Sequence, residues 1–139
     1  MIRNIEQEFE AISDYWSPRV VADVNGQCVK LAKLNGEFVW HDHANEDELF
    51  YVVRGGLTIR YRDRDDAVLS AGDLHVVPKG VQHNPVVEDE CWVMLFEPAE
   101  TKHTGEVIVE GTKSAAQQRA HLQTETMQSN GAGSEEVFP

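Results

Sequence analysis

The sequence is poor in the features that mark several classes of protein. Its two cysteines, Cys28 and Cys91, lie far apart and form no Cys-x-x-Cys pair, so a disulfide scaffold is not indicated. No apolar run is long enough to span a membrane. Only 12 basic residues stand against 24 acidic ones, and the net charge of -12 opposes binding to a phosphate backbone or an anionic membrane surface. We therefore expect a soluble protein that binds neither nucleic acid nor membranes.

The N-terminus also lacks a basic segment followed by an apolar core and a cleavage site, so nothing in it indicates export. We expect a cytoplasmic protein, in which Cys28 and Cys91 are small buried side chains and a disulfide between them is the minority interpretation. The 139 residues suit one domain, and a hydrophobic content of 41% is ordinary for a globular chain.

The first segment has the periodicity of an amphipathic helix. Ile5, Phe9, Ile12 and Trp16 recur at steps of four, three and four residues, and Pro18 ends the pattern. An apolar stripe with this spacing usually belongs to a core, so we expect the helix to pack on the rest of the fold; binding a partner is the less favoured alternative.

After this segment the pattern becomes extended. The dipeptides at residues 25–26 and 35–36 are Asn-Gly, which predicts tight hairpin turns between β-rich runs. Many short strands separated by turn residues, with no helical pattern between them, predict an all-β antiparallel sandwich or barrel. The predicted strands span residues 19–24, 27–34, 37–43, 49–54, 57–62, 67–70, 74–77 and 91–96.

The strand predicted at residues 91–96 is apolar at both parities, so both of its faces should be covered. A barrel interior covers one face. The other needs the N-terminal helix, a second sheet or another copy of the chain, and we expect a homodimer on this ground.

The composition changes near the C-terminus, where large apolar residues become few and a helix of moderate propensity is predicted at residues 114–127. We therefore divide the chain into an N-terminal helix at residues 1–17, a barrel at residues 18–111 and a C-terminal tail at residues 112–139.

Histidine and glutamate form the most specific pattern in the chain. His41 and His43 are two residues apart on a predicted strand, so their imidazoles point to the same face. Glu48 begins the next strand and completes a set of two histidines and one carboxylate, a common arrangement around a metal ion. His83 follows a turn at residues 78–80 and is the natural fourth ligand.

The two segments that contain these residues resemble the two sequence motifs of the cupin superfamily, and the resemblance covers about residues 29–98. The first motif is matched by His41, His43, Glu48 and Gly55. The second motif is matched by Gly72, Pro78, Gly80 and His83. Two positions depart from the pattern: Gly36 stands one residue too close to the first histidine, and Val87 replaces a frequent asparagine. Neither departure removes a ligand.

The resemblance implies a small cupin-type barrel, a double-stranded β-helix or jelly roll, with one divalent transition metal at its mouth. Three imidazoles and one carboxylate suit Fe, Mn, Ni, Co, Cu or Zn, and the donor set does not choose among them. No thiol belongs to the set, so a closed structural zinc site is not indicated. A partly apolar pocket beneath the ion is expected from Val39, Phe50, Val52 and Met94.

Cupins include dioxygenases, isomerases, epimerases, lyases, storage proteins and sugar-sensing domains, and the fold does not select one. The complete ligand set favours a metal-dependent enzyme that acts on a small molecule by dioxygenase or Lewis-acid chemistry. No acid and base pair is evident beyond the ligands, so no further catalytic residue is assigned and the isomerase version is less favoured. The alternative is a non-catalytic module that binds or senses a small ligand or metal. His75, His103 and His121 are interpreted as solvated or hydrogen-bonded side chains.

Overall fold

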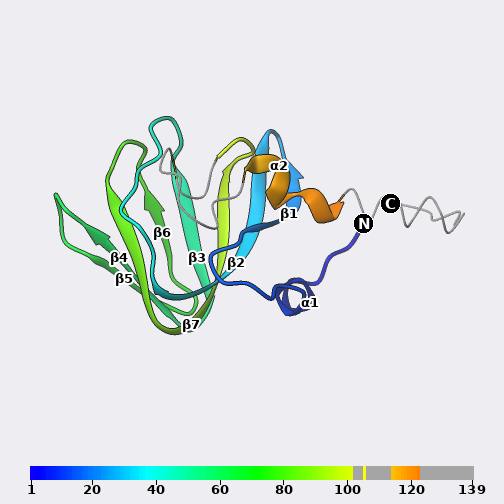
Figure 1. The fold of residues 1–139 in the computed structure, drawn as a ribbon, viewed down its shortest axis with the longest axis horizontal. Helices are drawn as coiled ribbons and strands as arrows, with labels where there is room; N and C mark the ends of the chain where they lie inside the picture. Colours follow the sequence, from blue (N-terminus) through cyan, green and yellow to red (C-terminus); the bar gives the residue numbers. More distant parts are fainter. Residues whose placement is uncertain (102–104, 106–113, 123–139) are drawn as a thin grey trace, which may run out of the picture.

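The structure, a computed structural model, describes residues 1–101, Gly105 and residues 114–122 (Figure 1). Residues 114–122 of the predicted C-terminal tail are described, and they contain α2 near the start of the helix predicted at residues 114–127. The rest of the tail and His103 lie outside the described residues. The helices and strands are α1 (Ile5–Glu10), β1 (Arg19–Val24), β2 (Gln27–Glu37), β3 (Glu48–Arg54), β4 (Gly56–Tyr61), β5 (Ala67–Ser70), β6 (Leu74–Val77), β7 (His83–Pro98) and α2 (Ala115–Gln118).

The strands form one curved antiparallel sheet in the order β1-β2-β7-β3-β6, and β4 pairs with both β7 and β5. The 16-residue strand β7 organises the sheet. Its first residues pair with β4, and its last residues pair with β2 on one side and β3 on the other. Figure 1 shows β4 and β5 at one end of the molecule and both helices beside β1 and β2 at the other. The predicted all-β architecture with a short N-terminal helix is confirmed.

Helix α1 is shorter than the N-terminal pattern predicts. Asn4 caps it by accepting a hydrogen bond from the backbone N–H of Gln7 at 3.0 Å. The pattern residue Trp16 does not continue the helix: its φ is 57°, and its backbone N–H donates to the carbonyl of Lys33 on β2 at 2.9 Å. A parallel bridge between Tyr15 and Lys33 explains the early end, because it commits this part of the segment to the sheet.

The two Asn-Gly dipeptides have different structures. Asn25 and Gly26 form the predicted turn between β1 and β2, both with positive φ. The hairpin predicted at Asn35 and Gly36 is wrong: β2 continues through it, and the register with β7 shifts between Leu34 and Gly36. Gly36, with φ of 81°, serves a β-bulge that bends the strand instead of reversing it.

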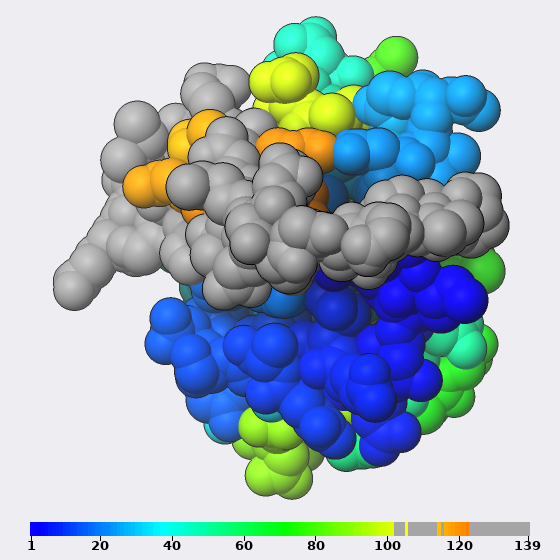
Figure 2. All heavy atoms as spheres, turned by 90° about the vertical axis from the view of Figure 1, so that its right-hand side faces the viewer, coloured from blue at the N-terminus to red at the C-terminus, as the bar shows by residue number. Residues whose placement is uncertain are grey.

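Two apolar clusters stabilise this arrangement. The interior of the curved sheet contains residues of one parity from the strands β2 to β7, such as Leu34 and Val93. A second cluster lies on the outer face, where Phe9 of α1 stacks on Trp92 with ring centroids 4.7 Å apart. The predicted packing of the helix stripe is therefore confirmed for Phe9 and Ile12. The N-terminal residues (dark blue) and α2 (orange) lie on the same face of the molecule in Figure 2.

Both cysteines are buried and carry free thiols. Burial raises the pKa of the Cys91 thiol to about 11, so it stays protonated and unreactive at neutral pH. None of the helices in the described ranges is long and apolar enough to cross a membrane.

Candidate metal centre

The four predicted ligands meet at one place in the fold. Ligand atoms of His41, His43, Glu48 and His83 all lie within 4.8 Å of one another. Their side chains are buried, none with more than 3% of its surface exposed. Glu48 is the first residue of β3 and His83 the first of β7, so strand pairing and the adjoining loops fix where the cluster forms.

The segment that contains the two neighbouring histidines differs from its prediction. No strand spans residues 37–43, because β2 ends at Glu37 and only an isolated bridge joins His41 to His83. In that bridge each backbone N–H donates to the other residue's carbonyl, at 3.0 and 2.9 Å. The extended backbone still directs both imidazoles inward: the ring centroids of His41 and His43 are 5.1 Å apart.

Two of the imidazoles are oriented by their own loops. Nδ1 of His41 is 2.9 Å from the carbonyl oxygen of Val39, and Nδ1 of His83 is 2.9 Å from that of Val81. A carbonyl only accepts, so each Nδ1 carries the proton and donates it. Each Nε2 then presents a lone pair to the centre of the cluster, which is the tautomer that a metal-binding histidine needs.

Several polar atoms of the cluster are buried without a hydrogen-bond partner. They are Nδ1 and Nε2 of His43, Oε1 of Glu48 and Nε2 of His83. Buried polar atoms are satisfied in the great majority of cases, because an unpaired one costs about 1–3 kcal/mol. Convergent lone pairs on nitrogen and carboxylate oxygen fit a divalent transition metal, which would bind one atom of each residue.

The electrostatics of the cluster favour a cation. Burial, together with the neighbouring His83, lowers the pKa of His41 to about 4, so this imidazole is neutral at pH 7. Burial alone would raise the pKa of Glu48, but the neighbouring imidazoles of His43 and His83, 3.5 and 3.8 Å from its Oε1, outweigh burial and hold that pKa well below its usual range. Burial would lower the pKa of His43, but the neighbouring Glu48 carboxylate outweighs burial and raises that pKa. The site thus presents an anionic carboxylate among imidazoles.

A second buried carboxylate, which the sequence did not predict, lies behind the cluster. Glu97 on β7 and Lys30 on β2 have no exposed surface, and Lys30 Nζ is 2.9 Å from Glu97 Oε1. Burial, and then the neighbouring charge of Glu48, raise the pKa of Glu97 well above its usual range, against the opposing influence of Lys30. Strand parity could have revealed their burial, because Lys30 has the same parity on β2 as Leu34, and Glu97 the same parity on β7 as Val93, both residues of the interior cluster.

An apolar cavity of about 30 Å³ adjoins the cluster, which is space for roughly one or two waters. Its walls include His41, Glu48, Trp16, Phe38, Phe50 and Leu95. The sequence pattern missed Trp16 and Phe38, which stack with ring centroids 4.5 Å apart. Phe38 also meets the His41 ring edge-on at 5.5 Å.

The four residues expected to line a pocket occupy different places. Phe50 lines the cavity, and Val52 is buried in the interior cluster. Val39 contributes its backbone carbonyl to His41. Met94 is corrected: it packs beside the outer cluster around α1, because Val93 points inward and side chains on a strand alternate.

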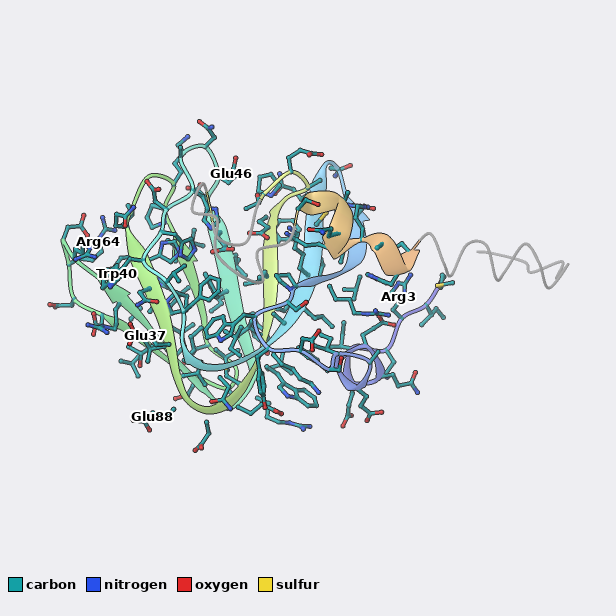
Figure 3. The ribbon with its side chains drawn as sticks, viewed as in Figure 1. Arg3, Glu37, Trp40, Glu46, Arg64 and Glu88 are labelled. Carbon is teal, nitrogen blue, oxygen red and sulfur yellow. The ribbon has the colours of Figure 1, made fainter. Side chains whose placement is uncertain are left out.

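The other histidines are hydrogen-bonded, as expected where they are described. Nε2 of His75 is 2.6 Å from the Tyr61 hydroxyl, and Nε2 of His121 is 2.8 Å from the carbonyl of Val20. Trp40 precedes a ligand in the chain but lies near β4 and β5 (Figure 3), with the guanidinium of Arg62 4.1 Å from the centre of its ring.

The structure is a small antiparallel barrel in which three histidines and a glutamate lie near the ends of strands. This is the class of single-domain barrel that the two sequence motifs indicate. Residues 29–97 match the cupin domain family, and the chain belongs to that family.

Several relatives share this fold and sequence. A cupin-2 domain containing protein from Shewanella frigidimarina is 45% identical, with a TM-score of 0.67 over 70% of this chain and 94% of its own. NMB1881 from Neisseria meningitidis is 32% identical, with a TM-score of 0.65 over 70% of this chain and 99% of its own. YdbB, an uncharacterized protein of Bacillus subtilis (strain 168), is 46% identical over 63 residues, which are 45% of this chain and 56% of YdbB. The match thus spans little more than half the length of that relative.

Proposed function

We propose that the chain is a metal-dependent cupin enzyme that acts on a small molecule, with the ion bound by His41, His43, Glu48 and His83. One observation supports this most directly: buried, converging ligand atoms of three of these residues have no hydrogen-bond partner. A bound ion would satisfy them, whereas a purely structural role would leave their desolvation uncompensated.

The surroundings of the cluster limit the substrate class. Of the residues that line the cavity, only His41 and Glu48 are polar and both belong to the proposed ligand set. The apolar walls would bind and orient a small, largely apolar molecule and exclude water from its reacting end. A metal in this position would supply Lewis-acid or one-electron chemistry to an oxygen-bearing group of that molecule. The chain's own contribution is to hold the His41 imidazole neutral and to orient the rings of His41 and His83.

Metal content tests the proposal directly. Protein purified without added metal should contain about one transition-metal ion per chain by elemental analysis, and the double variant His41→Ala, His83→Ala should contain almost none. His75→Ala is the matched control, because its imidazole lies on β6 and bonds Tyr61 instead of facing the centre. Equal metal content in the double variant and the wild type would contradict the assignment.

A non-catalytic binding or sensing module is the second candidate. The small volume of the cavity favours it, because about 30 Å³ admits no substrate without movement of its walls. Oxygen uptake by the Fe(II)-loaded protein, measured over small phenolic, thiol and keto-acid compounds, separates the two. Substrate-dependent uptake supports the enzyme, and binding of such compounds without turnover supports the module.

We also propose that the protein is a cytoplasmic homodimer. Two buried, free thiols are compatible with a reducing compartment. The dimer is supported by apolar side chains that remain exposed on the outer face of β6 and β7: Leu74, Val76 and Phe96. Burial of this row against a second copy would remove it from water.

A further inference from the structure

Three charged side chains lie inside the barrel on neighbouring strands. Lys30 of β2, Glu97 of β7 and Glu48 of β3 are each at most 2% exposed. Their strands are adjacent in the order β2-β7-β3, so the three form one row across the interior. Desolvating a buried ion pair costs several kcal/mol per ion, which the mutual attraction seldom exceeds. Fold stability alone does not account for the row.

Lys30 is fixed in place by three acceptors. Its Nζ is 2.9 Å from Glu97 Oε1, 2.6 Å from Gln118 Oε1 and 3.1 Å from the carbonyl oxygen of Thr101. The ammonium group donates hydrogen bonds to Gln118 and Thr101 and forms an ion pair with Glu97, so it cannot move without losing one of these contacts. One of these acceptors, Gln118, is the last residue of α2, outside the part of the chain that matches the cupin family.

Glu97 connects this lysine to the cluster. Leu49 of β3 pairs with Phe96 of β7 and Phe50 with Leu95, so Glu48 and Glu97 are neighbours across the two strands on the interior face. Lys30 contacts Oε1 of Glu97 from the other side. The other groups near Glu48 are the imidazoles of His43 and His83, at 3.5 and 3.8 Å from Oε1. Of the three neighbours of Glu48, Glu97 is therefore the one that is not itself a candidate ligand.

We propose that Glu97, anchored by Lys30, is a positioning residue that fixes the Glu48 carboxylate for metal binding, and that Gln118 of α2 completes the anchor. The inference rests on the proposed metal site and adds to it a contribution from the C-terminal helix. Partners that orient a metal ligand in this way typically change metal affinity about 10- to 100-fold when removed.

The test compares metal affinity and fold stability in the same variants. Lys30→Met with Glu97→Leu replaces the pair by apolar groups of similar size, a change that buried ion pairs often tolerate without loss of stability. We expect this double variant to remain folded in a denaturant titration without metal, while its dissociation constant for Co(II) rises about 10- to 100-fold. The visible spectrum of bound Co(II) should also shift, because the carboxylate ligand is no longer fixed.

Three further variants separate positioning of the Glu48 carboxylate from a general loss of stability. Glu97→Gln keeps the volume, an N–H to donate to Glu48 and an oxygen to accept from Lys30, so its Co(II) affinity and spectrum should stay close to wild type. Gln118→Ala removes only one acceptor of Lys30 and should weaken Co(II) binding by a smaller factor. Val87→Ala, a buried truncation in the half of β7 that pairs with β4, should lower stability without changing the spectrum.

The outcomes are distinct. Wild-type affinity and spectrum in the folded double variant would overturn the positioning role, as would equal weakening in Glu97→Gln and the double variant. Failure of the wild type to bind Co(II), Zn(II), Ni(II) or Mn(II) would instead overturn the proposed metal site itself.

Discussion

His41 and His83 share one local arrangement at the scale of single residues. Each imidazole donates from Nδ1 to the carbonyl of the residue two positions earlier, so a short extended stretch of backbone sets both the tautomer and the ring orientation. The motif spacing was sufficient to predict which residues converge. It could not predict these Nδ1 bonds, because they depend on the backbone of loops that the pattern assigned to a strand and a turn.

The depressed pKa of His41 predicts how the metal-free protein responds to acid. The unfolded imidazole titrates near 6.5 and the folded one at about 4, so the unfolded state binds more protons between these values. The stabilisation is present above pH 6.5 and is lost as the pH falls toward 4, by about 3 kcal/mol in total. Urea titrations in chelator at several pH values should show this fall.

The variant His41→Gln isolates the effect, because it should flatten the slope between pH 6.5 and 4.5. The raised pKa of Glu97 opposes this fall within the window, but it does so in both the variant and the wild type. The raised pKa of His43 acts in the opposite sense above the window, and the lowered pKa of Glu48 acts below it. A slope in the variant equal to that of the wild type would show that another group is responsible.

At the scale of elements, the turns beside the strands need two of the motif glycines for different reasons. Gly55, between β3 and β4, has φ of +86°, and a Cβ there would lie 2.5 Å from the backbone oxygen of Glu90. Gly72, before β6, has φ of +94° but open space around it. A side chain at either position is strained, and only the one at Gly55 also collides with backbone.

Alanine substitutions should separate these two costs. Gly72→Ala is expected to lower the free energy of unfolding by about 1 kcal/mol, from backbone strain alone. Gly55→Ala should lower it by at least about 1 kcal/mol more, because β7 must shift away from the new methyl group. Chemical denaturation of the two variants gives the difference, and equal losses would mean that β7 moves without cost.

The strands show what sequence periodicity can and cannot predict. Alternation identified most strand segments and the motifs identified the four side chains that converge, because both depend on near neighbours in the chain. Asn35 and Gly36 were misassigned because a bulge and a hairpin use the same residues, and only the partner strand decides between them. Lys30 and Glu97 looked like ordinary surface charges, since their burial depends on each other and on a helix distant in the chain.

At the scale of the whole molecule, one row of apolar side chains remains without cover. Val76 pairs with Leu49, which in turn pairs with Phe96, across the outer face of three adjacent strands. Val76 is 43% and Phe96 36% exposed, and β6 is the last strand of its sheet in the described part of the chain. The helix that covers the neighbouring cluster around Trp92 does not reach this row.

Light scattering after size-exclusion chromatography should therefore give about twice the chain mass of 15.6 kDa. Leu74→Glu with Val76→Glu should convert the protein to a monomer, because the charges would be buried in the interface. Val68→Glu is the control: Val68 is 75% exposed on β5, away from this row, and its variant should stay dimeric. A monomeric wild type would contradict the proposed homodimer.

The position of Trp16 beside the cavity makes its fluorescence a reporter of that site. Its indole borders the same cavity as His41 and Glu48, and it is fixed there by stacking on Phe38 and by donating Nε1–H to the carbonyl of Asn35 at 2.8 Å. The emission of this ring therefore responds to whatever enters the cavity and to any paramagnetic ion beside it. Subtracting the spectrum of a Trp16→Phe variant isolates that signal from the other two tryptophans, so occupancy of the site can be followed without a label.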